Sequence, residues 1–380
     1  MTKHIPVSSE PYATYTSKYQ APYASRGNFN RTWLHLDTPN EPEEEFTIIS
    51  YNILADYLAF KNRHLYSYCP NSVLTWANRG RKILKEIQAY KADIYCLQEC
   101  EKRHFHCDFA PALRRLGYRY VYKQRTGEDM WDGCAVLYNT KRFELVKHCT
   151  VEYNSDDFMD RNNVGIIVVL RDLKTNRKLC VANTHILFNT KRGILKIAQL
   201  QKLLLSAYEI ISSQPMPLVI CGDFNSTPHS LVYRYINDGV VDLSSMDEIF
   251  MSGQVEPFVP LHAQPKRAYN AETIHAFNAT QARFPEDDSV NRCILKHPYK
   301  FHSGYEHPMP SEEFTTLHDD AKLICDYIFF GGLTEQLRDS LLCTRQLSLP
   351  KIIDCTIPGI PAKDVPSDHL PLALAFSWTS

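Results

Sequence analysis

The chain has 380 residues, of which 44% are hydrophobic and 22% are charged. This is the composition of an ordinary globular protein, so disorder over the whole length, collagen-like repeats and a coiled coil are excluded. With 42 Lys and Arg against 43 Asp and Glu, the formal net charge is −1. The sequence therefore lacks a domain-wide basic charge, and a nucleic acid would have to be bound through a local patch or a metal.

The first 45 residues are polar, rich in Tyr and Pro, and end in the acidic run EPEEE. They hold too little periodic apolar content for a domain, so we expect residues 1–45 to form an extended N-terminal arm. The N-terminus has no apolar core of a signal peptide, and no run approaches the ~18 apolar residues of a membrane span. We therefore expect a cytoplasmic or nuclear protein that does not enter a membrane.

From Phe46 onward, apolar segments alternate with polar turns. Short β-branched or alternating segments predict strands, and longer amphipathic segments predict helices. The expected strands are 46–52, 94–97, 118–125, 134–139, 165–170, 178–185, 217–225, 323–330 and 370–376, and the expected helices lie near 78–90, 108–116 and 194–211. The strands 165–170 and 178–185 should pair as a hairpin. Residues 251–313 lack clear periodicity and predict an irregular insertion within one domain, 46–380.

The 12 cysteines form no C-x-x-C pair and no zinc-type spacing, and several lie inside apolar segments. We therefore expect buried, reduced thiols.

Nearly every predicted strand ends in a polar residue of a type that binds a hard cation or transfers protons. These residues are Asn52, Glu99, His185, Asp223 with Asn225, Asp326, and Asp368 with His369. Taken singly, an acidic residue at a strand end is more often a turn former, and a strand histidine is more often a hydrogen-bonded core residue. Their recurrence at one strand end after another indicates a shared cleft.

The chemistry that suits this set is hydrolysis at phosphorus. Mg²⁺ prefers oxygen ligands and needs only one or two carboxylates besides phosphate oxygens. Glu99 is the expected ligand, and Asn52 would add an oxygen without adding charge. Such a cation would polarise a phosphoryl oxygen and neutralise charge on the leaving group.

The remaining residues are of types that transfer protons or donate hydrogen bonds. Asp223 is suited to accept a proton from the attacking water, and Asn225 to orient water or phosphate. His369 paired with Asp326 would stay protonated and stabilise charge on phosphoryl oxygens. His185 would add a further donor to the phosphate.

The motifs SYN (50–52), LQE (97–99), NTH (183–185), GDFN (222–225), DYI (326–328) and SDH (367–369) occur in this order. Together they resemble the signature of the endonuclease/exonuclease/phosphatase superfamily, over about residues 46–380. The stretches ISYNILAD, ADIYCLQE, WDGCAVLYN and LICDYIFF are most similar to the Angel proteins of its CCR4-like branch. The resemblance implies an α/β fold of two packed, mainly antiparallel β-sheets flanked by helices, with the catalytic site at one edge between the sheets.

The resemblance also implies roles for the residues at the strand ends. Asn52 and Glu99 would bind Mg²⁺, and Asp223 and Asn225 would handle the nucleophile. His185 and the Asp326/His369 pair would contact phosphate, with Asp368 beside His369 in its motif.

The expected substrate is an RNA 3′ end. CCR4-type deadenylases hold the terminal adenine with a Pro, an Asn and a Phe, where this chain has Thr190, Thr316 and Ala321. An aromatic face worth ~1–3 kcal/mol per stacked base is thus missing, which argues against strong poly(A) preference. Angel proteins are associated with 2′,3′-cyclic phosphate phosphatase activity. The resemblance therefore implies a Mg²⁺-dependent RNA 2′,3′-cyclic phosphatase that leaves a 2′,3′-diol and uses no organic cofactor.

Two alternatives stay open: a deadenylase-like 3′-exoribonuclease, and a non-catalytic module that binds RNA or a translation factor. The intact catalytic set argues against the second. Basic residues expected near the cleft, where they would neutralise the RNA backbone, are Lys123, Arg125, Arg161, Lys191 and Arg192. Rings that could stack on a terminal base, although core or rim packing is their commoner role, are Tyr57, Trp131, Phe188 and Phe224.

Overall fold

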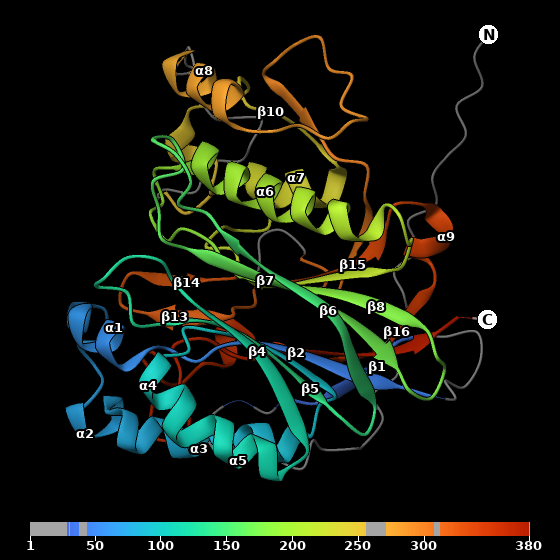
Figure 1. The fold of residues 1–380 in the computed structure, drawn as a ribbon. Coiled ribbons are helices and arrows are strands. Elements are labelled where there is room, and N and C mark those ends of the chain that lie inside the picture. The colour runs from blue at the N-terminus through green and yellow to red at the C-terminus, as the bar shows by residue number, and fades with distance from the viewer. Residues whose placement is uncertain (1–28, 30, 38–43, 256–270, 308–311, 380) are drawn as a thin grey trace, which may run out of the picture.

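The computed structural model describes residues 29, 31–37, 44–255, 271–307 and 312–379. Two β-sheets pack face to face at its centre, and helices cover the outer face of each sheet (Figure 1). The fold class expected from the sequence is therefore confirmed.

The first sheet has seven strands. In spatial order they are β1 (Trp33–His35), β16 (Leu341–Leu347), β17 (Leu372–Trp378), β2 (Phe46–Asn52), β3 (Ile94–Gln98), β5 (Gly133–Asn139) and β4 (Tyr118–Gln124). All neighbours are antiparallel except β2 and β3, which run parallel. The helices on its outer side are α3 (Trp76–Tyr90), α4 (Lys102–His104) and α5 (Ala110–Arg115), with a π-helical turn at Phe105–Phe109 between the last two (Figure 1).

The second sheet has six strands. In spatial order they are β12 (Lys300–Ser303), β15 (Asp326–Gly332), β9 (Leu218–Asp223), β8 (Lys178–His185), β7 (Val164–Asp172) and β6 (Phe143–Glu152). β8 and β9 run parallel, and β7 and β8 form the expected antiparallel hairpin. The helices α6 (Gly193–Ile211) and α7 (Leu231–Asp238) lie on its outer side (Figure 1).

Shorter elements connect and flank the two sheets. They are α1 (Asp56–Lys61), α2 (Asn71–Leu74), α8 (Ala271–Thr280), α9 (Glu335–Arg338), the pair β10 (Val240–Asp242) and β11 (Ile294–Lys296), and the pair β13 (Thr316–His318) and β14 (Ala321–Leu323). None of the helices in the described part of the chain combines the length and the apolar character that crossing a bilayer requires.

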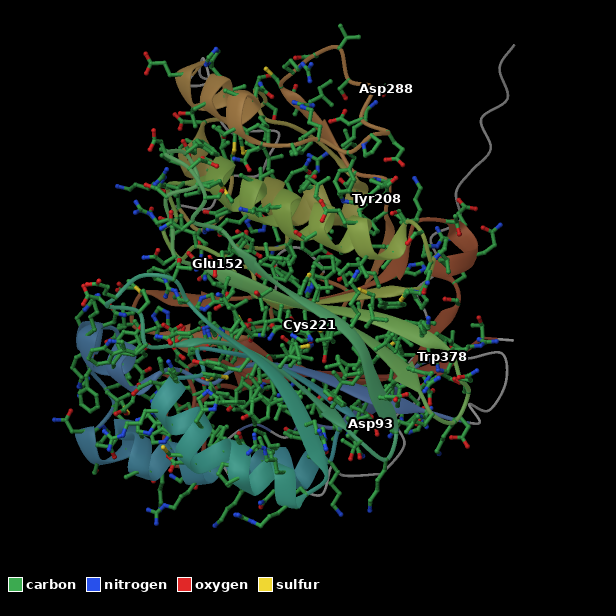
Figure 2. All side chains as sticks on the ribbon, viewed as in Figure 1. Asp93, Glu152, Tyr208, Cys221, Asp288 and Trp378 are labelled. Atoms are coloured by element: carbon green, nitrogen blue, oxygen red, sulfur yellow. The ribbon has the colours of Figure 1, made fainter. Side chains whose placement is uncertain are left out.

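The core follows from alternation along the strands. Ile48 of β2 belongs to the cluster that includes Ile166 of β7 and Ile220 of β9, whereas its neighbour Ile49 packs with the α3 side chains. Successive strand residues point to opposite faces, so one strand serves both layers. Cys221 of β9 lies in the inner layer between the sheets (Figure 2). All 12 cysteines are free thiols, but only seven are buried, four are half-buried and Cys107 is exposed, so the expectation of buried thiols is confirmed in part.

Two expectations about the fold are wrong in part. The described part of the insertion 251–313 contains α8, β11 and β12, and β12 forms an edge of the six-stranded sheet by pairing with β15. Within the expected N-terminal arm, Trp33–His35 forms β1, which pairs with β16; residues 1–28 lie outside the described residues. Strands of three or four residues show no readable period, and pairing with a distant partner defines them.

Candidate active site

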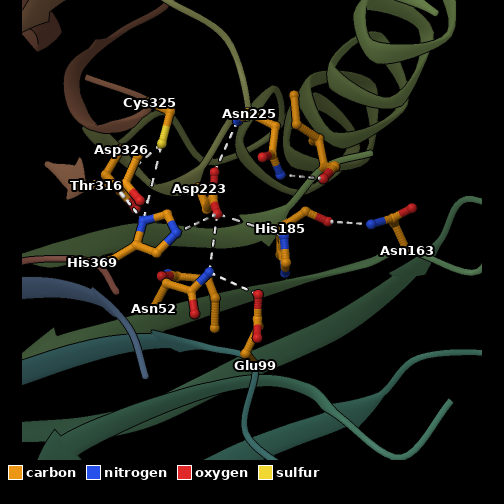
Figure 3. Close-up of polar contacts among 12 residues, drawn as sticks. Asn52, Glu99, Asn163, His185, Asp223, Asn225, Thr316, Cys325, Asp326 and His369 are labelled. Atoms are coloured by element: carbon orange, nitrogen blue, oxygen red, sulfur yellow. Dashed lines mark hydrogen bonds and ion pairs between the residues drawn. The ribbon is translucent and has the colours of Figure 1, made fainter. Parts of the chain in front are cut away.

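The predicted residues meet where strands of the two sheets end (Figure 3). In the six-stranded sheet, Asp223 is paired in register with His185 on one side and with Asp326 on the other. The seven-stranded sheet contributes Asn52, the last residue of β2, and Glu99, which directly follows β3. A cavity of about 180 Å³ opens between them, and Glu99, Asp223 and His185 line it. The structure therefore brings these predicted residues together.

His369 lies between two carboxylates. Its Nδ1 is 2.8 Å from Asp326 Oδ2, and its Nε2 is 3.6 Å from Asp223 Oδ2. Burial by itself would lower the pKa of His369, but Asp326 and Asp223 raise this pKa well above its usual value. The imidazole is thus a buried cation that faces the cavity.

Asp223 contacts several other residues of the site, as Figure 3 shows. Its Oδ1 accepts a hydrogen bond from the Asn225 backbone N–H (2.9 Å), and its Oδ2 accepts one from the Asn52 side-chain amide (3.0 Å). Gly222 lets this strand end approach β8, because a Cβ atom there would lie 2.1 Å from the Thr184 carbonyl oxygen. Asp223 therefore contacts groups from both sheets.

His185 differs from His369 in its charge. Its Nε2 is 3.6 Å from Asp223 Oδ2. Burial lowers the pKa of His185 to about 4, with the positive charges of Arg125 and His369 acting in the same direction and Asp223 opposing them. At neutral pH His185 is a neutral imidazole, so it can donate one hydrogen bond without adding charge.

Glu99 lies in a strongly acidic part of the cavity. Its Oε1 accepts from the Asn52 amide (3.1 Å) and its Oε2 from the Ala55 backbone N–H (3.0 Å). Burial and the negative charges of Asp368 and Asp132 raise the pKa of Glu99 to about 8. Carboxylate oxygens that crowd together in this way fit a hard divalent cation, which would neutralise them.

Asn52 lies beside Glu99, as expected for a second ligand, but its amide nitrogen faces the carboxylates. The amide oxygen accepts a hydrogen bond from the Leu54 backbone N–H (3.0 Å). In this orientation Asn52 links Glu99 to Asp223 across the two sheets.

The backbone around the site is strained. Leu54, Glu99 and Asn225 have φ angles of 54°, 56° and 45°, in the left-handed region. Such a conformation costs a non-glycine residue about 1–2 kcal/mol. The hydrogen bonds of Glu99 and Asn225 described above hold them there, and strain of this kind is concentrated at functional sites.

Asp368 secures the segment that carries His369. Its Oδ2 accepts a hydrogen bond from the Tyr66 hydroxyl (2.7 Å), and its carbonyl oxygen accepts one from the Thr316 hydroxyl (2.8 Å). Thr316 lines the cavity, but this bond engages its hydroxyl. Thr190 is not among the lining residues, and its carbonyl oxygen accepts from the Ser252 hydroxyl (2.8 Å).

Of the five basic residues expected at the cleft, only Arg125 lines the cavity, and its Nη1 is 3.6 Å from Asp132 Oδ1. The others form ion pairs away from it or lie exposed, namely Lys123 with Glu152, Arg161 and Arg192 with Asp160, and Lys191 at the surface. Substrate binding by these four stays a prediction.

The aromatic rings expected to stack on a terminal base differ in their exposure and in their distance from the cavity. Phe188 lines the cavity with 58% of its surface exposed. Trp131 is 53% exposed and packs on Tyr57 with ring centroids 5.3 Å apart. Phe224 is buried in the core beside Tyr327, so it cannot stack on a base.

Sequence reasoning missed Lys196 of α6, which is completely buried. Its Nζ donates to the Asn225 carbonyl oxygen and to Gln254 Oε1 (3.1 Å), and burial lowers the pKa of Lys196 to about 7. The signal was a lysine within the apolar stretch GILKIAQL. Tyr66, which anchors Asp368, gave no signal of this kind.

The chain belongs to the Endonuclease/Exonuclease/phosphatase family, whose sequence model matches residues 49–369. Enzymes of this family generally depend on a divalent cation. The chain is 35% identical to protein angel homolog 2 of Danio rerio over 87% of its length, and 31% identical to the Homo sapiens protein over 89%. It spans 64% and 70%, respectively, of the length of those relatives.

The chain also resembles solved structures of the Angel group. The chain is similar to ANGEL2, a 2′,3′-cyclic phosphatase, in its complex with adenosine-2′,3′-vanadate. The TM-score is 0.78 at 33% identity, over 92% of this chain and 98% of that one. The human Nocturnin catalytic domain shares the fold, with a TM-score of 0.60 at 23% identity over 93% of this chain and 99% of that one. These matches confirm the resemblance to the Angel group of the CCR4-like branch.

Proposed function

We propose that the protein is a phosphoric-ester hydrolase that removes the 2′,3′-cyclic phosphate from RNA 3′ ends and leaves a 2′,3′-diol. One observation carries the proposal: the cavity unites the hydrolytic residues in a chain 33% identical to ANGEL2, a 2′,3′-cyclic phosphatase. The missing adenine contacts agree with it, since a site that reads a terminal ribose and phosphate needs no base-specific clamp.

The reaction consumes two waters. In the first step, a water oxygen bonds to phosphorus and one ring P–O bond breaks, which opens the strained ring to a monoester. In the second step, another water displaces the remaining ribose oxygen and releases phosphate. In each step the attacking water loses a proton and the departing ribose oxygen gains one. Asp223, which accepts hydrogen bonds from Asn225 and Asn52, would accept the proton of the water.

The two histidines would act on the phosphoryl oxygens. His369, kept protonated between Asp326 and Asp223, would place a positive charge beside the oxygens that become more negative in the transition state. His185, neutral at pH 7, would donate a hydrogen bond. Both groups are positioned by the fold before substrate binds, so little reorganisation is needed.

Glu99, with Asn52 beside it, would hold the divalent cation, and we propose Mg²⁺ because the acidic groups that raise the pKa of Glu99, Asp368 and Asp132, are carboxylates, which offer oxygen ligands. When bound, the cation polarises a phosphoryl oxygen and neutralises charge on the leaving group. Phe188 and Arg125, which line the same cavity, are the residues proposed to contact the terminal nucleotide.

The test uses two short RNAs of one sequence, one ending in a 2′,3′-cyclic phosphate and the other in a 3′-hydroxyl, each incubated with Mg²⁺. We expect loss of the cyclic phosphate with no shortening of either RNA. Shortening of the hydroxyl-ended RNA at a similar rate would favour the 3′-exoribonuclease instead. Binding of either RNA without turnover would favour a non-catalytic module.

A further inference from the structure

Cys325 lies directly beside the phosphate-binding residues, and the reaction proposed above does not use it. It precedes Asp326 in the chain, is buried, and lines the cavity. Its Sγ is 3.6 Å from Asp326 Oδ2, 4.0 Å from His369 Nδ1 and 3.9 Å from the Thr315 hydroxyl. A sulfur ligand is therefore available within a site that otherwise offers oxygen and nitrogen.

Three side chains around this sulfur have the spacing of a metal site. Asp223, Cys325 and His369 each offer one ligand atom, and these atoms all lie within 4.8 Å of one another. In a tetrahedral zinc site, with Zn–S of about 2.3 Å and Zn–N or Zn–O of about 2.0 Å, neighbouring ligand atoms are about 3.3–3.6 Å apart. His369 Nε2 and Asp223 Oδ2 already have such a separation, 3.6 Å. The upper limit of 4.8 Å exceeds the tetrahedral spacing by about 1.2–1.5 Å, so the three side chains would have to move closer together to bind one cation.

The surroundings of His369 also match those of a metal-bound histidine. Asp326 Oδ2 lies 2.8 Å from Nδ1, and Nε2 is directed toward Asp223. A carboxylate that holds one ring nitrogen and leaves the other for the metal is the usual support of a histidine ligand. Because sulfur and imidazole suit zinc, whereas Mg²⁺ prefers oxygen, this trio and Glu99 would select different cations.

We propose that Cys325, His369 and Asp223 form an inhibitory site for a thiophilic divalent cation of the zinc class, separate from the hard-cation ligand Glu99. Binding releases the thiol proton and the proton on the coordinating nitrogen of His369. The histidine then cannot present its positive charge to the phosphoryl group, and Asp223 cannot act as the base. Zinc should therefore inhibit in the presence of saturating Mg²⁺. The inhibition rests on the proposed function, whereas the binding does not.

The binding test titrates Co²⁺, a spectroscopic substitute for zinc, into the full chain. We expect a near-ultraviolet thiolate-to-cobalt charge-transfer band at one equivalent. The band should be lost in Cys325→Val, which replaces the thiol by a slightly larger apolar side chain without a ligand atom, and should remain in Cys180→Val. Cys180 of β8 is the control because it is buried like Cys325 but lies in the core, away from the cavity. A band of equal amplitude in Cys325→Val would overturn the proposal.

The inhibition test measures the zinc concentration that halves the rate of each variant relative to its own zinc-free rate in saturating Mg²⁺. We expect this concentration to rise at least ~10-fold in Cys325→Val and to stay unchanged in Cys180→Val. Unchanged zinc sensitivity in Cys325→Val would mean that zinc acts elsewhere, for example at Glu99, and would overturn the inhibitory role. If the protein fails to hydrolyse cyclic phosphates, the cobalt band still decides the binding proposal.

Discussion

The two sides of the cavity balance their charges in different ways. At the ends of β15 and β9 of the six-stranded sheet, Asp326 and Asp223 enclose His369, which comes from the segment before β17, so the protein supplies both signs of charge itself. On the side of the seven-stranded sheet, Glu99 lies near Asp368 and Asp132, and its pKa rises to about 8. The first side is complete once the chain folds, whereas the second would gain its balancing charge from the proposed cation. Substitutions on the two sides should therefore differ in how they change the Mg²⁺ dependence of the rate and the stability of the fold.

The largest loss is expected for Asp223→Asn, because Asp223 is the residue that joins the two sides. The amide cannot accept the proton of the water, so the rate of cyclic-phosphate removal should fall by about 10²–10⁴-fold. Single-turnover assays of the end-labelled RNA measure it, and Asp288→Asn, an exposed aspartate on the loop before β11, is the control. A rate within tenfold of the wild type would show that another group is the base.

Glu99→Gln tests the side that needs a cation. The rate should fall by about 10²–10³-fold in limiting Mg²⁺. The Mg²⁺ concentration for half-maximal activity should rise, because a charged ligand is replaced by a neutral one. The variant should be at least as stable as the wild type in EDTA at pH 7, since folding no longer has to raise the pKa of this carboxyl to about 8 and protonate it. Unaltered Mg²⁺ dependence would contradict the assignment of Glu99 as a ligand.

His369→Asn tests the opposite side and should show the reverse pattern. The rate should again fall by about 10²–10³-fold, but the half-saturating Mg²⁺ concentration should change little. Removal of the buried positive charge leaves Asp326 and Asp223 without their partner, which should cost about 3–5 kcal/mol of stability. The measurement is the free energy of unfolding by urea of Glu99→Gln and of His369→Asn, both in EDTA. Equal stability of the two would mean that the sides do not differ as described.

A smaller effect is expected for Lys196→Met, which removes support from behind the Asp223–Asn225 turn. The lost bond to the Asn225 carbonyl oxygen is worth about 0.5–3 kcal/mol, because Lys196, with a pKa of about 7, is only partly charged at neutral pH, so kcat should fall by about 2–100-fold with KM nearly unchanged. Lys202→Met, on the same helix but less buried, is the control. A change confined to KM would instead place Lys196 in substrate binding.

The sequence predicted most of the long strands, although not β6 or β16, and it predicted the site residues at strand ends, because these leave local signals. The run 46–52, for example, is β-branched and apolar and ends at Asn52, and it is strand β2 in the structure. The features that could not be predicted from the sequence depend on contacts between residues far apart in the chain. The strand β1 exists through β16, and the Tyr66 bond to Asp368 joins residues 302 positions apart. The charge states of His185 and His369 also depend on three-dimensional surroundings, since both are buried but only His369 lies between two carboxylates.

The smallest effect on catalysis is expected for His297→Phe. His297 lies outside the cavity and is a buried histidine with no acidic partner among the described residues. His297 packs among aromatic rings, with centroids 5.1 Å from Tyr235 and 5.9 Å from Phe301. Burial lowers the pKa of His297 to about 4, although nearby backbone groups oppose the shift. Phenylalanine has a similar shape and suits the cluster, so we expect normal activity at pH 7.

The effect of His297→Phe should appear in the acid stability of the fold. An unfolded histidine takes up a proton near pH 6.5, whereas folded His297 does so only near pH 4. Between these values the unfolded chain binds more protons, so stability falls as pH is lowered from 6.5 to 4. At about 1.4 kcal/mol per pH unit, protonation of the unfolded histidine should lower the free energy of unfolding by about 2 kcal/mol between pH 6.5 and pH 5. The phenylalanine variant has no proton to take up at this position, so it should not lose this stability. Urea midpoints at pH 7 and pH 5 measure this. His185 and His307 also have a pKa lowered to about 4, so the variant should retain part of the acid sensitivity. If the urea midpoints at pH 7 and pH 5 differ by the same amount in the variant and in the wild type, His297 is already protonated in the folded protein.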